Sequence, residues 1–94
     1  MKAVWTKAAI RDLVHIREYI ARENPGAARE IALKIVDATD RTIQFPELGR
    51  AGRVNGTREL VVSDTPYLIV YRLKKKAIHF LIVLHGHQRW PKGK

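Results

Sequence analysis

The sequence predicts a single α+β domain, residues 1–94, in which a helical hairpin packs on one face of a β-sheet. Three observations support this fold class. Apolar residues recur at helical spacing between residues 7 and 43, three β-prone runs follow residue 56, and a loop-forming segment separates the two regions. Helices gathered in one half of a chain and strands in the other are typical of α+β domains. The length suffices for one modest core.

The N-terminal segment predicts a short strand followed by a long helix. Residues Lys2–Trp5 alternate polar and apolar side chains, as a strand does. Thr6 then supplies a hydroxyl suited to capping the first turn of a helix. From Lys7 to Glu23 the apolar side chains recur at steps of three and four, which forms one helical stripe of Ala9, Leu13, Ile16 and Ile20.

A second helix is predicted from the Asn24-Pro25-Gly26 turn onward. Proline disfavours a helical conformation at Asn24, and Asn24 can cap a new helix that has Pro25 in its first turn. The three-and-four spacing continues to Ile43, and Phe45-Pro46 ends it. Two helices joined by so tight a turn form an antiparallel hairpin whose apolar stripes face a common layer.

The C-terminal half predicts a loop and three consecutive antiparallel strands. Pro46–Gly56 contains three glycines and one proline, which is typical of a loop. Arg58–Val62, Leu68–Leu73 and Ala77–Leu84 are rich in β-branched and aromatic residues. Pairing of the N-terminal strand beside the last strand would add a fourth. We therefore expect a three- to four-stranded antiparallel sheet in the order β-α-α-β-β-β.

The last predicted strand shows which of its faces belongs to the core. Strict alternation places Ile78, Phe80, Ile82 and Leu84 on one face, which we assign to the core because it is the more apolar. The connection before this strand, Lys74-Lys75-Lys76, lacks the Gly or Asn usual in a hairpin turn. Three lysines there keep the turn solvated and discourage aggregation.

The charge of the chain predicts a polyanionic partner. The formal net charge is +9, and residues 46–94 carry ten Lys/Arg against three Asp/Glu, whereas residues 1–45 carry eight against six. The basic surface therefore belongs to the sheet half, which favours nucleic acid or an acidic protein segment as partner. The absence of cysteine excludes disulfides and thiolate chemistry. With no apolar run long enough for a bilayer and no secretion signal, we expect no membrane association and a cytoplasmic location.

The order of elements and several short motifs of the sheet half resemble those of the RelE/ParE superfamily, the toxins of type II toxin–antitoxin modules. The matching segments are Gly56-Thr57-Arg58-Glu59-Leu60, Thr65-Pro66-Tyr67, Val70-Tyr71-Arg72, Leu84-His85-Gly86 and Arg89-Trp90-Pro91. The resemblance covers nearly the whole chain, and it is the order and spacing of these segments that carry it. It implies a small basic toxin without cofactor, in a hetero-oligomer with an acidic, partly disordered antitoxin that has a DNA-binding N-terminus.

The resemblance implies two alternative modes of action. RelE-like members cleave mRNA on the ribosome without a metal, and many carry a catalytic arginine directly after the tyrosine that opens the penultimate strand. Here that position holds Leu68, and no tyrosine lies near the C-terminus. ParE-like members inhibit DNA gyrase, typically have the long helical hairpin, and lack the nuclease residues. We therefore favour the ParE-like branch, which would not be an enzyme. A RelE-like endoribonuclease and an inactive homologue that only binds antitoxin are the alternatives.

The candidate functional residues follow from these alternatives. A nuclease would use His85, His87, Arg72 and Arg58, because phosphodiester cleavage needs proton transfer and positive charge. The two histidines lack an evident third ligand, so we predict no metal site. Residues proposed to contact a partner or phosphate are Arg50, Arg53, Arg58, Arg72, Arg89 and Trp90.

Each of these assignments has a plainer structural alternative. Arg58 and Arg72 form one cationic patch if adjacent strands bring them together, but Arg58 can also pair with Glu59 or Asp64. Trp90 can stack on a base, or it can cover the open end of a small core. The helix residues proposed to receive the antitoxin can equally belong to the core; they are Leu13, Ile16, Ile31 and Ile35.

Overall fold

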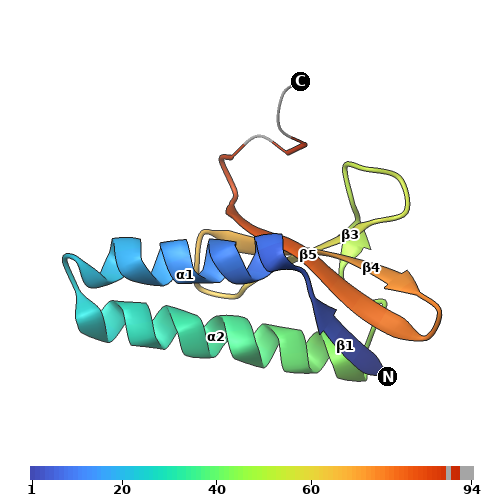
Figure 1. The fold of residues 1–94 in the computed structure, drawn as a ribbon, viewed down its shortest axis with the longest axis horizontal. Helices are drawn as coiled ribbons and strands as arrows, with labels where there is room; N and C mark the ends of the chain where they lie inside the picture. Colours follow the sequence, from blue (N-terminus) through green and yellow to red (C-terminus); the bar gives the residue numbers. More distant parts are fainter. Residues whose placement is uncertain (89, 92–94) are drawn as a thin grey trace.

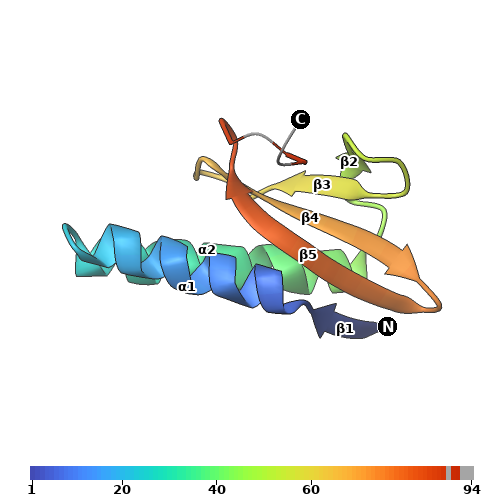
Figure 2. The ribbon, with the colours of Figure 1, turned by 45° about the horizontal axis from the view of Figure 1, so that its top comes forward.

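The computed structural model describes residues 1–88, 90 and 91, and it has one mixed sheet with both helices on a single face (Figures 1 and 2). The elements are β1 (Lys2–Trp5), α1 (Lys7–Ala21), α2 (Pro25–Gln44), β2 (Arg50–Ala51), β3 (Arg58–Val61), β4 (Tyr67–Lys74) and β5 (Ala77–His85). The predicted α+β class and the order of helices and main strands are confirmed. In the described part of the chain, neither helix is long and apolar enough to cross a membrane.

Both helices begin with a side-chain cap at the predicted residue. The Thr6 hydroxyl accepts a hydrogen bond of 3.0 Å from the Ala9 N–H. The Asn24 carboxamide accepts one of 3.0 Å from the Ala27 N–H, and Pro25 occupies the first turn of α2. Both bonds satisfy N–H groups that have no partner inside the helix. The Asn24 cap starts α2 only three residues after the end of α1, so the chain turns sharply between the two helices.

The sheet has five strands in the order β1-β5-β4-β3-β2, which differs from the expected sheet in two details. First, β1 does lie beside β5, but it runs parallel to it, with Lys2 opposite Ala77 and Trp5 opposite Phe80. The long excursion through the helices and the other strands makes a parallel neighbour possible. Second, the predicted loop contains the short strand β2, which pairs with β3. A strand of two residues is too short to show an alternating pattern in the sequence, and β2 forms only through its pairing with β3.

A β-bulge in β5 changes which side chains face the helices. Val70 pairs with Ile82 and Tyr71 with Phe80, so Leu81 is the extra residue on β5. Beyond the bulge the alternation is shifted by one, and Val83 joins the core under the helices. The prediction that Ile82 and Leu84 share the face of Ile78 and Phe80 was therefore wrong past Phe80, because it assumed an uninterrupted strand.

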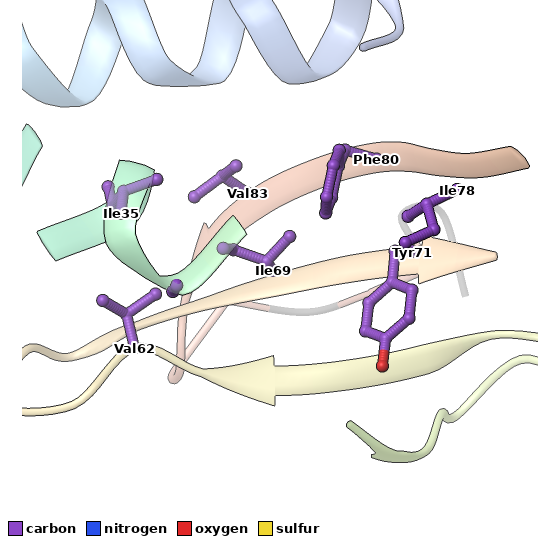
Figure 3. Packing of buried hydrophobic residues seen from close by; sticks show 8 residues of the cluster. Ile35, Val62, Ile69, Tyr71, Ile78, Phe80 and Val83 are labelled. Atoms are coloured by element: carbon purple, nitrogen blue, oxygen red, sulfur yellow. The ribbon is translucent and has the colours of Figure 1, made fainter. Parts of the chain in front are cut away.

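Two apolar clusters lie on the two faces of the sheet. The main one, drawn in Figure 3, packs under the helices. Its buried members are Ile35, Ala38, Val62, Ile69, Tyr71, Ile78, Phe80 and Val83. The second cluster lies on the helix-free face and consists of Leu68, Val70 and Leu84, with Leu81, Ile82 and Trp90 packed against it. Trp90 thus covers apolar sheet surface, which is the plainer of its two predicted roles.

The β4–β5 connection is a two-residue turn in a conformation that its residues disfavour. Lys74 pairs with Ala77, and the residues between them, Lys75 and Lys76, have φ of 50° and 63°. Positive φ at both central positions matches a type I′ turn, for which Asn-Gly is the preferred sequence. For a residue with a side chain this left-handed conformation costs about 1–2 kcal/mol.

Candidate functional site

An apolar hollow of about 170 Å³ lies between the two helices of the hairpin, lined by residues of both. All four residues predicted to receive an antitoxin line it: Leu13, Ile16, Ile31 and Ile35. Ile35 is fully buried and belongs to the core, whereas the other three are half-buried. Val14 and Val36 also line it, with 49% and 52% of their surface exposed, as do Arg17, Ala28 and Ala32. Neither valine was predicted from the sequence, because each lies one position outside the apolar stripe of its helix.

The loop that follows α2 is held in place by two side chains of the sheet, Tyr71 and Arg58. The Tyr71 hydroxyl donates to the Pro46 carbonyl at 2.7 Å and accepts from the Gly49 N–H at 2.8 Å. A Cβ at Gly49 would lie 2.8 Å from the Tyr71 hydroxyl, so only glycine allows this approach. Arg58 Nη1 donates to the carbonyls of Gly49 and Glu47 at 2.8 and 3.3 Å. Arg58 therefore has a structural role in the folded chain.

The predicted cations Arg50 and Arg53 surround a buried carboxylate. Glu59 has 2% of its side chain exposed and lies 3.4 Å from Arg50 Nη2 and 3.5 Å from Arg53 Nε. It also accepts the Arg53 backbone N–H at 2.8 Å. Arg53 also contacts the segment after β5, because its Nη1 donates a hydrogen bond of 3.4 Å to the Gln88 carbonyl. The sequence shows that Glu59 lies inside a β-prone run, but it does not show that Arg50 and Arg53 contact its carboxylate.

Arg58 and Arg72 do not form the single patch considered above. The β3–β4 register places Arg58 opposite Tyr71, and directly opposite residues share a face. Because successive side chains on a strand point to opposite faces, Arg72 lies on the helix-free side and Arg58 on the helix side. Arg72 is paired across the sheet with His79, and among the described residues no ion pair or hydrogen bond of its side chain occurs.

His85 and His87 lie together at the far end of β5. Their rings stack with centroids 5.1 Å apart, and the His87 N–H donates to His85 Nδ1 at 3.2 Å. His85 also meets the Tyr67 ring edge-on at 5.7 Å and is paired with Tyr67. Within residues 1–88 and 90–91, three His, Cys, Asp or Glu side chains do not come together in a way that could hold a metal ion.

The proposed nuclease residues are therefore spread over the sheet. Arg72 and the histidine pair are separated by five residues along β4, or about 17 Å at the usual rise of a strand. Arg58 lies on the other face. Leu68, at the position of the arginine in many RelE-like nucleases, is 4% exposed and packs in the second apolar cluster. The predicted contact residue Arg89 lies outside the described residues.

A helical hairpin on one face of a mixed sheet, with an apolar hollow between its helices and a basic sheet half, defines the class of small type II toxins that the sequence motifs resemble. The family model of the "ParE toxin of type II toxin-antitoxin system, parDE" matches residues 3–90. The chain belongs to this ParE toxin family.

Individual relatives agree with this assignment over most of the chain. It is 42% identical to Y4kP of Sinorhizobium fredii, over 93% of this chain and 90% of the relative. It is 38% identical to Toxin RelE2 of Caulobacter vibrioides, over 90% and 94%. Among solved structures, a chain of the chromosomal ParDE TA system from P. aeruginosa superposes with a TM-score of 0.84 at 27% identity, covering 90% of this chain and 95% of that one. YafQ from E. coli shares the fold, with a TM-score of 0.51, 12% identity, and coverage of 89% and 91%.

Proposed function

We propose that this member of the ParE family inhibits DNA gyrase and is neutralised by a cognate antitoxin. The observation that carries the choice of target is the burial of Leu68 in an apolar cluster, at the position where many RelE-like nucleases place an arginine. Leucine can neither donate a hydrogen bond nor offset the charge of a phosphate in a transition state. The dispersal of the four candidate nuclease residues over both faces and both ends of the sheet supports the same choice.

The apolar hollow supports antitoxin binding to the helical hairpin. Its lining is almost wholly apolar and offers anchoring positions between two helices, which suits the apolar face of an amphipathic segment. The basic charge of the chain favours an acidic segment. The structural relative from P. aeruginosa comes from a ParDE TA system, which agrees with a partner of this kind.

A supercoiling assay tests the target. We expect the purified chain at micromolar concentration to inhibit supercoiling of relaxed plasmid by gyrase, and prior addition of the antitoxin to restore it. Expression in cells without the antitoxin should cause DNA damage and filamentous growth. Intact supercoiling under these conditions would contradict the proposal. An absence of both supercoiling inhibition and growth arrest would favour the inactive, antitoxin-binding homologue.

The stacked pair His85 and His87 is the one feature that favours an endoribonuclease instead. Both rings are accessible at the end of β5, and histidine can transfer protons near neutral pH. Primer extension on mRNA from translating ribosomes distinguishes the two functions. We expect no cuts, and we expect the double variant His85→Ala/His87→Ala to inhibit gyrase as the parent chain does. Cuts that disappear in this variant would establish the nuclease.

A further inference from the structure

The β4–β5 turn places lysine at two positions where the backbone favours asparagine and glycine. Lys75 and Lys76 both have positive φ, and neither has a side chain that forms the local hydrogen bonds by which Asn or Asp tolerates this region. The fold itself would be more stable with Asn-Gly at this turn. Backbone strain that persists in a native structure points to a use for the residues that bear it.

Three further cations share the helix-free face next to this turn. The strand registers align Lys2, Ala77 and Lys74 in one row across β1, β5 and β4, and Val4, His79 and Arg72 in the next row. Directly paired residues share a face, and Ile78 and Phe80, the neighbours of these β5 residues, point into the core under the helices. We call Lys2, Arg72, Lys74, Lys75 and Lys76 the cationic tip.

The charge of the cationic tip is not neutralised within the described structure. Its four lysines are exposed and Arg72 is half-buried. The ion pairs between described residues, Arg41–Asp37, Arg50–Glu59 and Arg53–Glu59, all lie elsewhere. The sequence has no Asp or Glu before Asp12 or after Asp64. The tip lies at the opposite end of the molecule from the α1–α2 turn (Figure 1), so an antitoxin in the hollow of the helical hairpin leaves it open.

We propose that the cationic tip is a binding site for the phosphate backbone of duplex DNA. The two rows span about 10 Å across three strands and about 7 Å along them, a surface that meets several phosphates of a duplex at once. Single-stranded RNA and DNA are bound through aromatic side chains that stack on bases. Of the rings near the tip, those of Trp5, Tyr71 and Phe80 point into the core under the helices, and among the described residues the half-buried His79 is the ring that shares the face of the tip. The choice of DNA rests on the proposed function, because duplex DNA is the substrate that gyrase holds.

Binding through phosphates has a characteristic salt dependence. Five cations predict a slope of about −4.5 for the logarithm of the association constant against the logarithm of the salt concentration. The dissociation constant should lie in the micromolar range or weaker at physiological salt, with little dependence on DNA sequence. Fluorescence anisotropy of a labelled 20-base-pair duplex, titrated with the chain between 50 and 200 mM NaCl, measures both.

The double variant Lys75→Asn/Lys76→Gly tests the site with opposite effects on stability and binding. Relief of the unfavourable turn should raise Tm by about 5 °C. Loss of two ammonium groups should weaken DNA binding about tenfold at 50 mM NaCl and reduce the salt slope by about 2. The matched control is Arg22→Gln/Arg29→Gln, which removes the same charge from exposed positions beside the α1–α2 turn and should leave affinity and slope close to those of the parent chain.

Three outcomes would overturn the proposal: unchanged affinity in Lys75→Asn/Lys76→Gly, an equal loss in the arginine control, or tighter binding of the parent chain to an RNA oligonucleotide of the same length. The second would assign binding to net charge, and the third would assign the tip to RNA. The titration uses DNA without gyrase, so its failure is distinct from that of the proposed function. If gyrase inhibition is found and DNA binding is not, only the role of the cationic tip is wrong.

Discussion

Tyr71 shows how much of this fold depends on a single side chain. Its ring is buried in the main cluster and lies 6.2 Å from Phe80, while its hydroxyl bridges the Pro46 carbonyl and the Gly49 N–H. Burial raises the pKa of this phenol above its ordinary value of 10.0, although the Gly49 hydrogen bond and the charge of Arg58 act in the opposite direction. Tyr71 therefore joins the sheet to the end of the helical hairpin.

We expect Tyr71→Phe to lower the free energy of unfolding by about 1–3 kcal/mol, because the buried Gly49 N–H and the Pro46 carbonyl lose their partner. Urea unfolding at neutral pH measures this loss. Tyr67→Phe is the matched control, since the Tyr67 hydroxyl makes no hydrogen bond within residues 1–88 and 90–91. Equal effects of the two substitutions would show that the hydroxyl bonds of Tyr71 contribute little.

The raised pKa of Tyr71 also predicts a loss of stability in alkali. Above about pH 10 the phenol of the unfolded chain loses its proton first, so the unfolded state binds fewer protons and the free energy of unfolding falls as pH rises. Burial also raises the pKa of Tyr67. In Tyr71→Phe only the contribution of Tyr67 remains, so the free energy of unfolding should fall less steeply with pH. Unfolding midpoints between pH 8 and 11 measure the difference, and parallel curves would contradict it.

At the scale of elements, Thr6 links β1, α1 and the bulge of β5. Its hydroxyl accepts from the Ala9 N–H and donates to the Leu81 carbonyl at 2.8 Å, and its backbone N–H donates to the Phe80 carbonyl at 3.1 Å. Past the end of β1 the exposed edge of β5 continues, and there Asp12 of α1 accepts the Val83 N–H at 3.0 Å. Helix α1 thus takes the place of a strand along this edge, which protects it from pairing with another chain.

Thr6→Ala should lower the free energy of unfolding by about 1–2 kcal/mol, because it removes the helix cap and the bond to Leu81 together. Thr6→Ser keeps the hydroxyl and should restore most of the loss. Thermal and urea unfolding of both variants provide the measurement. A similar loss in both would indicate that the methyl group of Thr6, through packing, is what matters.

The whole molecule presents two chemically different surfaces. The helical hairpin carries the apolar hollow between its two helices, and the helix-free side of the sheet carries the cationic tip and the arginines around Glu59. The hollow is lined by residues of α1 and α2, whereas the β4–β5 turn lies at the end of the molecule opposite the α1–α2 turn (Figure 1). The two surfaces can therefore be occupied at the same time. Separate variants can therefore test antitoxin binding and target binding.

For the hollow we expect Val36→Arg to weaken antitoxin binding at least tenfold while toxicity persists, because a charge at the rim must lose its hydration when the partner covers it. Val61→Arg, on β3, is the matched control, since the two valines are 52% and 51% exposed. Calorimetric titration of the antitoxin into each variant measures the effect. Unchanged affinity for Val36→Arg would place the antitoxin elsewhere.

The sequence by itself determined the helices, their caps and the three main strands, because periodicity and capping are local properties of neighbouring residues. It also predicted the family, since the short motifs keep their order and spacing. It could not predict the parallel pairing of β1, the strand β2 or the bulge at Leu81, because each depends on contacts between segments distant in the chain.

Only the tertiary structure decided which cations are available to a partner. Arg50 and Arg53, with side chains 62% and 38% exposed, share the single carboxylate of Glu59, and Arg58 binds loop carbonyls, because the β2–β3–β4 register brings these groups together. Arg72 and the lysines of the β4–β5 turn are left unpaired among the described residues. The sequence contains the charges, but long-range hydrogen bonding between strands fixes their register. That register determines whether each charged side chain contacts groups of the fold or remains accessible to a partner.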